Sequence, residues 1–262
     1  MHLPLVTVRL ALLGLILFSG TARAACTNAD PAHAAWTAVM QRWAANGDVD
    51  YAGMKREGQP QLDAYLATLA GTCGADYQNW TPQDRIAFWL NAYNAFTVRL
   101  ILDNYPIASI RKIGWLPLAA FREKFIPMPG LKGATISLDE IENGTLRTAF
   151  HESRIHFALV CASRSCPALR GEAYRGADLD RQLDDQARSF LRDPAKNRVD
   201  RAARTLYLSS IFKWFRADFE AAAGSLQAYV APYLDAGGEV STYDVEFLDY
   251  DWSLNDRNGG SK

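Results

Sequence analysis

The segment TPQDRIAFWLNAYNAFTVRLILDNYP, which begins at Thr81, places the strongest constraint on how this chain can fold. Thr81 and Asp84 form a helix start signal, and Pro106 follows the point where the helix must end. Between them, residues 86–102 are apolar on nearly every side of a helix. Such a helix is stable only when other elements cover all of its faces. The sequence therefore predicts a buried central helix with the rest of the chain around it.

The remaining periodic segments predict an α+β fold with more helix than strand. Helices are expected over residues 31–46, 61–69, 137–150, 178–191 and 209–223. Strands are expected over residues 154–161, 198–200, 205–208 and 244–252. No repeat or clear linker divides the sequence. We therefore expect a single helix-rich domain, residues 25–262, around a small and mostly antiparallel sheet, with a buried central helix.

The N-terminus predicts export. Arg9 precedes a short apolar run over residues 10–18, and small residues follow it. This pattern is typical of a signal peptide over residues 1–24, and the run is short for a membrane-spanning helix. A lipid anchor at Cys26 is disfavoured because Arg23 stands where an aliphatic residue is needed. We expect a periplasmic or secreted protein without a transmembrane segment in its mature chain.

Charge and motifs argue against several classes of function. The 28 basic and 29 acidic side chains give a net charge of −1, and no basic block stands out, so nucleic acid is not an expected partner. No glycine-rich phosphate loop, G-x-S-x-G elbow or H-E-x-x-H motif is present. We expect no cofactor, and no metal because the C-x4-C spacing differs from the usual zinc spacings. The expected partner is an unknown peptide or small-molecule ligand.

The segment HFALVCASRSCP, from His156 to Pro167, carries most of the reactive side chains. It allows three interpretations: a reactive thiol site, a disulfide loop, or a buried strand that contains sulfur. Export favours paired cysteines. The simplest pairing is Cys26 with Cys73 and Cys161 with Cys166.

The thiol interpretation needs a base near a sulfur. On a regular strand, His156 and Cys161 would face opposite sides, whereas a turn could return Cys166 toward His156. Arg164 and a helix start at Cys166 would lower the pKa of that thiol. Glu142, from the preceding helix, could orient the imidazole. Which cysteine would react stays open.

Two asparagines lie inside the apolar helix. Asn91 and Asn94 are three residues apart and so share one side of it. Buried amides need hydrogen-bond partners. They either brace a neighbouring backbone segment, which we favour, or orient a binding site.

Four blocks together resemble domain-of-unknown-function family 547, which occurs in exported bacterial proteins and in plants. The blocks are RIAFWLNAYNAFT, SLDEIENGTLR, RIHFALVCASRSCPALR and LYLSSIFKWFRADF, in the order of the family. The resemblance implies that characteristic positions of the family are occupied here by Asn91, Asn94, Glu142, His156, Cys161, Ser163, Cys166 and Asp218. After Glu142 the family tends to have histidine, whereas this chain has Asn143.

Two functions follow as hypotheses. The first is an exported thiol-dependent hydrolase or acyl transferase that acts on peptide or amide bonds. Its nucleophile would be Cys161 or Cys166, its base His156 and its orienting group Glu142, while Asn91, Asn94 and Ser163 would contribute to binding. The alternative is a non-catalytic envelope domain that binds a ligand or partner, with both cysteine pairs oxidised. A thiol–disulfide redox module is a weaker third idea, because C-x4-C is not the usual redox spacing.

Overall fold

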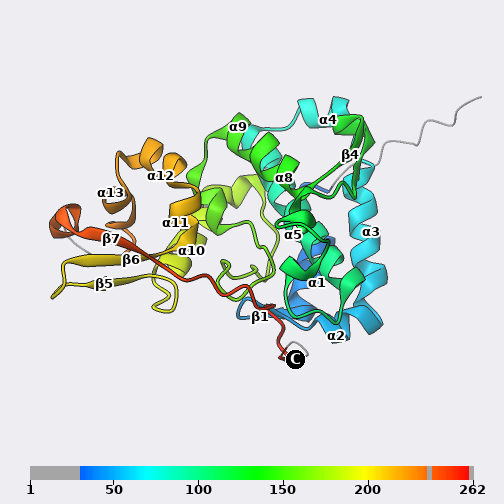
Figure 1. Ribbon diagram of the computed structural model, residues 1–262. Coiled ribbons are helices and arrows are strands. Elements are labelled where there is room, and N and C mark those ends of the chain that lie inside the picture. The colour runs from blue at the N-terminus through cyan, green and yellow to red at the C-terminus, as the bar shows by residue number, and fades with distance from the viewer. Residues whose placement is uncertain (1–29, 235–237, 260–262) are drawn as a thin grey trace, which may run out of the picture.

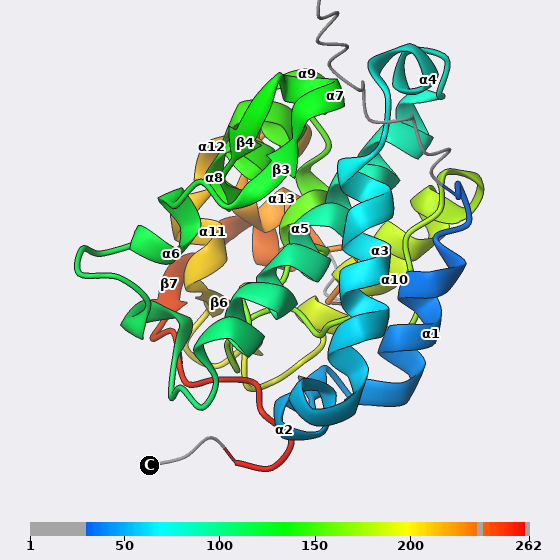
Figure 2. The same ribbon diagram turned by 90° about the vertical axis from the view of Figure 1, so that its right-hand side faces the viewer.

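The longest helix of the described chain is the predicted central one. The structure is a computed structural model that describes residues 30–234 and 238–259. Helix α5 (Pro82–Asn104) begins where the side chain of Thr81 accepts the backbone N–H of Asp84. It lies between α3 (Gln59–Ala70) and α8 (Leu138–Ile141) (Figure 2). Its residues 86–98 are all buried, as its apolar composition predicts.

The elements before α5 form one side of the molecule. Asp30 starts this region, since its carboxylate accepts the backbone N–H groups of Ala32 and Ala34. Besides α3, the elements are α1 (Ala34–Trp43), β1 (Ala44–Ala45), β2 (Asp48–Val49), α2 (Tyr51–Gly53), the π-helical turn η1 (Met54–Gly58) and α4 (Gly74–Gln78).

Short helices and strands follow α5 and lead to the segment that contains His156 and the two cysteines. Ser137 and Glu140 form the predicted capping box at the start of α8. Strands β3 (Ile126–Met128) and β4 (Ala134–Ile136) pair antiparallel. The other elements are η2 (Ile110–Lys112), α6 (Ala119–Arg122), α7 (Pro129–Lys132), the π-helical turn η3 (Glu142–Leu146) and α9 (Arg147–Phe150).

The C-terminal part contains a three-stranded sheet. Strand β6 (Thr205–Ser209) pairs antiparallel with β5 (Arg198–Asp200), as predicted, and parallel with β7 (Asp244–Leu248). The remaining elements of this part are η4 (Ser153–Phe157), η5 (Gly176–Asp178), α10 (Leu179–Leu191), α11 (Ser210–Trp214), α12 (Arg216–Ala223), α13 (Leu226–Val230) and η6 (Gly238–Thr242). Figure 1 shows this part beside the helices that surround α5.

The described residues form two hydrophobic cores that lie side by side. The larger surrounds α5, and the smaller joins the three-stranded sheet to α10, α11, α12 and α13. The segment after α9 connects them, because Ile155 belongs to the larger core and Phe157 to the smaller. His156 therefore lies at the junction. The predicted α+β, helix-rich fold is confirmed, with small sheets of two or three strands.

The strand predicted over residues 154–161 is wrong. The chain there forms the short 3-10 helix η4 and then an irregular segment. The side chain of Asn94 takes the place of a strand partner: its amide donates to the carbonyl of Ala158 at 2.9 Å and accepts the N–H of Val160 at 2.9 Å. The run of apolar residues could not distinguish this arrangement from a buried strand.

The first 29 residues, and with them the predicted signal peptide, lie outside the described residues. Within residues 30–234 and 238–259, no helix combines the length and the apolar character that crossing a membrane requires.

Candidate functional site

A pocket of about 430 Å³ opens between the two cores. Four residues singled out in the sequence line it, namely Glu142, His156, Cys161 and Cys166. Asp139 and Arg111 add charged groups. Aromatic rings form much of the remaining wall, and they come from Tyr93, Phe121, Trp214, Phe215, Tyr250 and Trp252. Residues from η3, η4, α11 and the segment after β7 thus converge on one hollow.

His156 is fixed in this wall by Asp218, from α12. Its Nε2 lies 2.8 Å from the Asp218 carboxylate. Arg147 donates two hydrogen bonds to the same carboxylate, at 2.6 and 2.7 Å. These bonds from Arg147, and then the one from His156, hold the pKa of Asp218 far below its usual value. Because Asp218 is ionised, Nε2 of His156 carries the proton and donates a hydrogen bond to the carboxylate.

The other nitrogen of His156 faces Glu142. Nδ1 lies 3.7 Å from Oε1 of Glu142, which is too long for a hydrogen bond. Nδ1 is buried without a hydrogen-bond partner, and the Glu142 carboxylate makes no hydrogen bond within the described residues. The ring of Phe215 stacks on the imidazole with centroids 3.9 Å apart. Asp218 and Phe215, rather than Glu142, therefore set the orientation of His156.

Both cysteines of the pocket are bonded to each other. Cys161 and Cys166 form a disulfide with their Cα atoms 6.1 Å apart. Sγ of Cys166 accepts the backbone N–H of Cys161 at 2.8 Å, and it lies 3.3 Å from the hydroxyl of Tyr250. Sγ of Cys161 lies 3.2 Å from Oγ of Ser163 and 3.3 Å from the same hydroxyl. Neither sulfur hydrogen-bonds to His156 within the described residues.

Cys73 is also disulfide-bonded. Its predicted partner, Cys26, lies outside the described residues.

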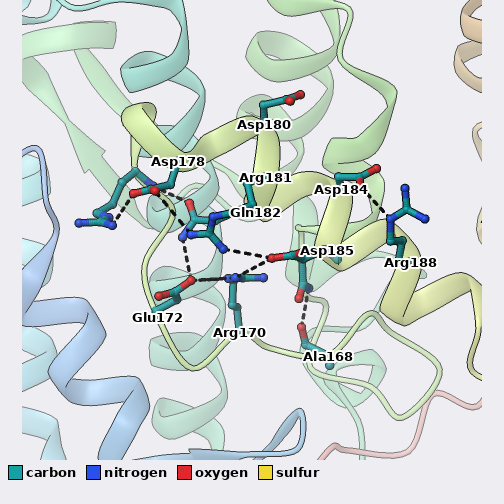
Figure 3. Close-up of polar contacts among 12 residues, drawn as sticks. Ala168, Arg170, Glu172, Asp178, Asp180, Arg181, Gln182, Asp184, Asp185 and Arg188 are labelled. Carbon is teal, nitrogen blue, oxygen red and sulfur yellow. Dashed lines mark hydrogen bonds and ion pairs between the residues drawn. The ribbon is translucent and has the colours of Figure 1, made fainter.

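Helix α10 holds the disulfide loop through hydrogen bonds to the chain on both sides of the loop. Gln186 donates to the carbonyls of Phe157 at 3.1 Å and Ala168 at 3.0 Å, one before and one after the loop. Further along, Glu172 accepts from Arg170 at 2.7 Å and from Gln182 at 3.2 Å (Figure 3). These contacts fix both ends of the segment that carries the two sulfurs.

The two asparagines of α5 brace backbone and do not line the pocket. Asn91 holds Tyr174 through two hydrogen bonds, from Nδ2 to the Tyr174 carbonyl at 2.8 Å and from the Tyr174 N–H to Oδ1 at 2.9 Å. Asn94 makes the corresponding pair of bonds with Ala158 and Val160. Both side chains are buried, so their amides replace the hydrogen bonds that a neighbouring strand would supply. Asn94 thereby positions the chain that leads into Cys161.

Sequence reasoning did not assign a role to Asp218 or to the aromatic wall. The resemblance named Asp218 as a characteristic position but did not connect it to His156, 62 residues earlier. Asp218 lies in the segment KWFRADF, where Lys213 and Arg216 are also charged, so its charge alone gives no signal of a contact with His156. Trp252 could not be assigned to a groove or a core from the sequence, and here it lines the pocket.

A metal site is not formed by the described side chains: no group of three or more His, Cys, Asp or Glu residues there is arranged to hold an ion. Asp139 and Glu142 both line the pocket, but Asp139 is engaged by Nδ2 of Asn143 at 2.9 Å. The arrangement can instead accept hydrogen bonds from a ligand at Glu142, whose side chain is 15% exposed.

Comparison with known proteins identifies the family. Residues 77–191 match the model of a family described as Protein of unknown function, DUF547. No curated protein and no solved structure matches the chain. The matched segment contains Glu142, His156 and both cysteines of the pocket, while Asp218 and Trp252 lie beyond it. The resemblance predicted from the sequence is therefore confirmed by the match of residues 77–191 to the DUF547 family.

Proposed function

We propose that this protein is an exported binding domain whose pocket takes a small molecule or peptide that carries a positively charged nitrogen. The observation that carries the proposal is the carboxylate of Glu142. Its side chain is only 15% exposed, lines the pocket and has no hydrogen bond within the described residues. This partly buried carboxylate faces the pocket, and a ligand ammonium group would supply a charge-assisted hydrogen-bond donor for it.

The aromatic wall supports the same ligand class. The rings of Trp214 and Trp252 stack with centroids 5.7 Å apart, and Tyr250 lies 4.7 Å from Trp252. Faces of indole and phenol rings attract cations. The guanidinium of Arg111 already lies 5.4 Å from the centroid of Trp252, so this ring accepts a cation within the molecule itself.

The state of the cysteines favours binding over thiol chemistry. In the oxidised form, Cys161 and Cys166 are part of the pocket wall, and neither offers a thiolate. A disulfide is also compatible with an oxidising compartment. Together with the predicted signal peptide, it supports a periplasmic or secreted location.

Titration of the oxidised protein with amines tests the proposal. Trp214 and Trp252 line the pocket, so their fluorescence should change as a primary or quaternary amine binds. Glu142→Gln, which keeps the shape but removes the charge, should weaken binding at least tenfold. Glu220→Gln on α12, where the carboxylate pairs with Arg216 at 2.7 Å, is the matched control and should bind normally. Equal affinity for amines and their uncharged analogues would contradict the proposal.

Thiol-dependent hydrolysis or acyl transfer is the second candidate, and it requires the reduced protein. The observation in its favour is that His156 and both sulfurs line one pocket. After selective reduction, iodoacetamide should then alkylate Cys161 or Cys166 rapidly, and His156→Ala should slow that reaction. An unchanged rate in His156→Ala would remove the histidine from the mechanism.

A further inference from the structure

We propose that the Cys161–Cys166 disulfide is a thiol–disulfide exchange site that oxidises dithiols entering the pocket. The proposal goes beyond ligand binding and does not depend on the amine ligand. It rests on three features: the unequal exposure of the two sulfur-bearing residues, the hydrogen-bond donors beside the sulfurs, and the hydrogen bonds that hold the loop independently of the S–S bond.

The two cysteines differ in access. Cys166 is 3% exposed, whereas Cys161 is only partly buried and lines the pocket. Exchange proceeds by attack of an external thiolate on the sulfur that it can reach. Cys161 is therefore the sulfur that is attacked, and Cys166 is the leaving group.

Two donors lie within hydrogen-bond distance of the leaving sulfur, and one of them, the Tyr250 hydroxyl, is equally close to Cys161. Sγ of Cys166 receives the backbone N–H of Cys161 at 2.8 Å and lies 3.3 Å from the hydroxyl of Tyr250. A disulfide sulfur is a weak acceptor, but a thiolate is charged and forms much stronger hydrogen bonds. Burial raises the pKa of Tyr250, so its hydroxyl keeps the proton that it donates. These donors stabilise negative charge where it develops when the S–S bond breaks.

The loop holds its conformation through bonds other than the disulfide. The N–H of Arg164 donates to the carbonyl of Ser253 at 2.9 Å, and the N–H of Asn255 donates to the carbonyl of Ala162 at 3.2 Å. Gln186 joins the two ends of the segment, as described above. The two sulfurs therefore remain close after reduction.

The reaction balances as follows. A thiolate of the dithiol forms a bond to Sγ of Cys161, and the S–S bond breaks with its electron pair on Cys166. The second thiolate of the same substrate then attacks the substrate sulfur of the mixed disulfide and releases Cys161. The dithiol loses two electrons and becomes a disulfide, and the two cysteines gain those electrons and take up the two protons.

Single-cysteine variants test which sulfur exchanges. Cys166→Ser leaves Cys161 free and Cys161→Ser leaves Cys166 free, so the two variants lack the same S–S bond and form a matched pair. With glutathione disulfide as the probe, we expect Cys166→Ser to form a mixed disulfide at least tenfold faster than Cys161→Ser. Equal rates, or a faster reaction at Cys166, would overturn the assignment.

Tyr250→Phe tests the role of the donors. Reduction of the Cys161–Cys166 bond by dithiothreitol should slow about tenfold, because one hydrogen bond to the leaving thiolate is lost. Tyr207→Phe, on β6 and away from the pocket, is the control and should react like the natural protein. The double variant Cys161→Ser/Cys166→Ser gives the background from other disulfides. A rate in Tyr250→Phe equal to that of the control would show that no donor assists the exchange.

Discussion

His156 is fixed at its Nε2 side and unpartnered at its Nδ1 side, and this asymmetry defines the site at the scale of single residues. Asp218 accepts from Nε2 and is itself held by Arg147. Glu142 lies 3.7 Å from Nδ1 without bonding to it. Sequence reasoning selected His156 and Glu142 from their residue types. It assigned no role to Asp218, because a contact across 62 residues leaves no local signal.

Replacing Asp218 should destabilise the fold. Asp218→Asn removes the charge that Arg147 and His156 share, and we expect a loss of about 1–3 kcal/mol in the free energy of unfolding at pH 7. The lowered pKa of Asp218 makes its contribution present above the ordinary carboxyl pKa near 4, and this contribution declines as the pH falls below that value. In urea unfolding, the difference in the free energy of unfolding between the variant and the natural protein should therefore become smaller at acidic pH. Asp244→Asn, at an exposed position of β7, is the control. Equal free energies of unfolding for Asp218→Asn and the natural protein at pH 7 would contradict this account.

His33 should make stability depend on pH. Burial lowers the pKa of this side chain to about 4, and Nδ1 of the neutral ring lies 2.8 Å from the Tyr65 hydroxyl. Between pH 6.5 and about 4, the unfolded chain binds a proton at this position and the folded chain does not. Stability should therefore fall by about 3 kcal/mol as the pH decreases through that window.

The variant His33→Asn should show a flatter dependence in unfolding measurements over the same window. His33 and the exposed His151 both have a left-handed backbone, which asparagine tolerates. His151→Asn is therefore the matched control. Equal slopes in the two variants would exclude His33 as the source.

At the scale of elements, the sequence predicts where helices begin more reliably than it distinguishes a strand from irregular backbone. Thr81 and Ser137 begin helices where their capping patterns predict. The apolar residues of the interval 154–161 predict a strand, yet the side chain of Asn94, on a helix, supplies the hydrogen-bond partners of the backbone there. Hydrogen-bond partners this distant in sequence cannot be read from periodicity.

The two asparagines of α5 allow a matched test of this bracing. Asn94→Ala should cost about 2–4 kcal/mol and expose the amide of Val160 to hydrogen exchange, because its acceptor is lost. Asn91→Ala should instead expose the amide of Tyr174 and leave Val160 protected. Residue-resolved hydrogen exchange distinguishes the two patterns. If both variants exposed the same amides, each substitution would have destabilised the whole fold, and the separate bracing roles of Asn91 and Asn94 would be wrong.

At the scale of the whole molecule, the pocket exists because two cores meet along the segment that carries His156. The helix-rich α+β class could be predicted from the sequence, since periodicity and capping are local. The meeting of η3, η4, α11 and the segment after β7 could not, because it depends on how the two cores pack. The pocket therefore combines side chains that the sequence placed more than a hundred residues apart, such as Glu142 and Trp252.

The central claim is that a positively charged nitrogen binds in this pocket, beside Glu142 and the aromatic wall. Nuclear magnetic resonance of the indole N–H groups tests it most directly, because tryptophans lie both in the pocket and in the core. As an amine is added to the oxidised protein, the signals of Trp214 and Trp252 should shift, while those of the buried Trp36 and Trp89 should not. In Glu142→Gln, the same shifts should require at least tenfold more amine. Shifts at an unchanged amine concentration in that variant, or the absence of shifts in the two pocket tryptophans, would contradict the claim.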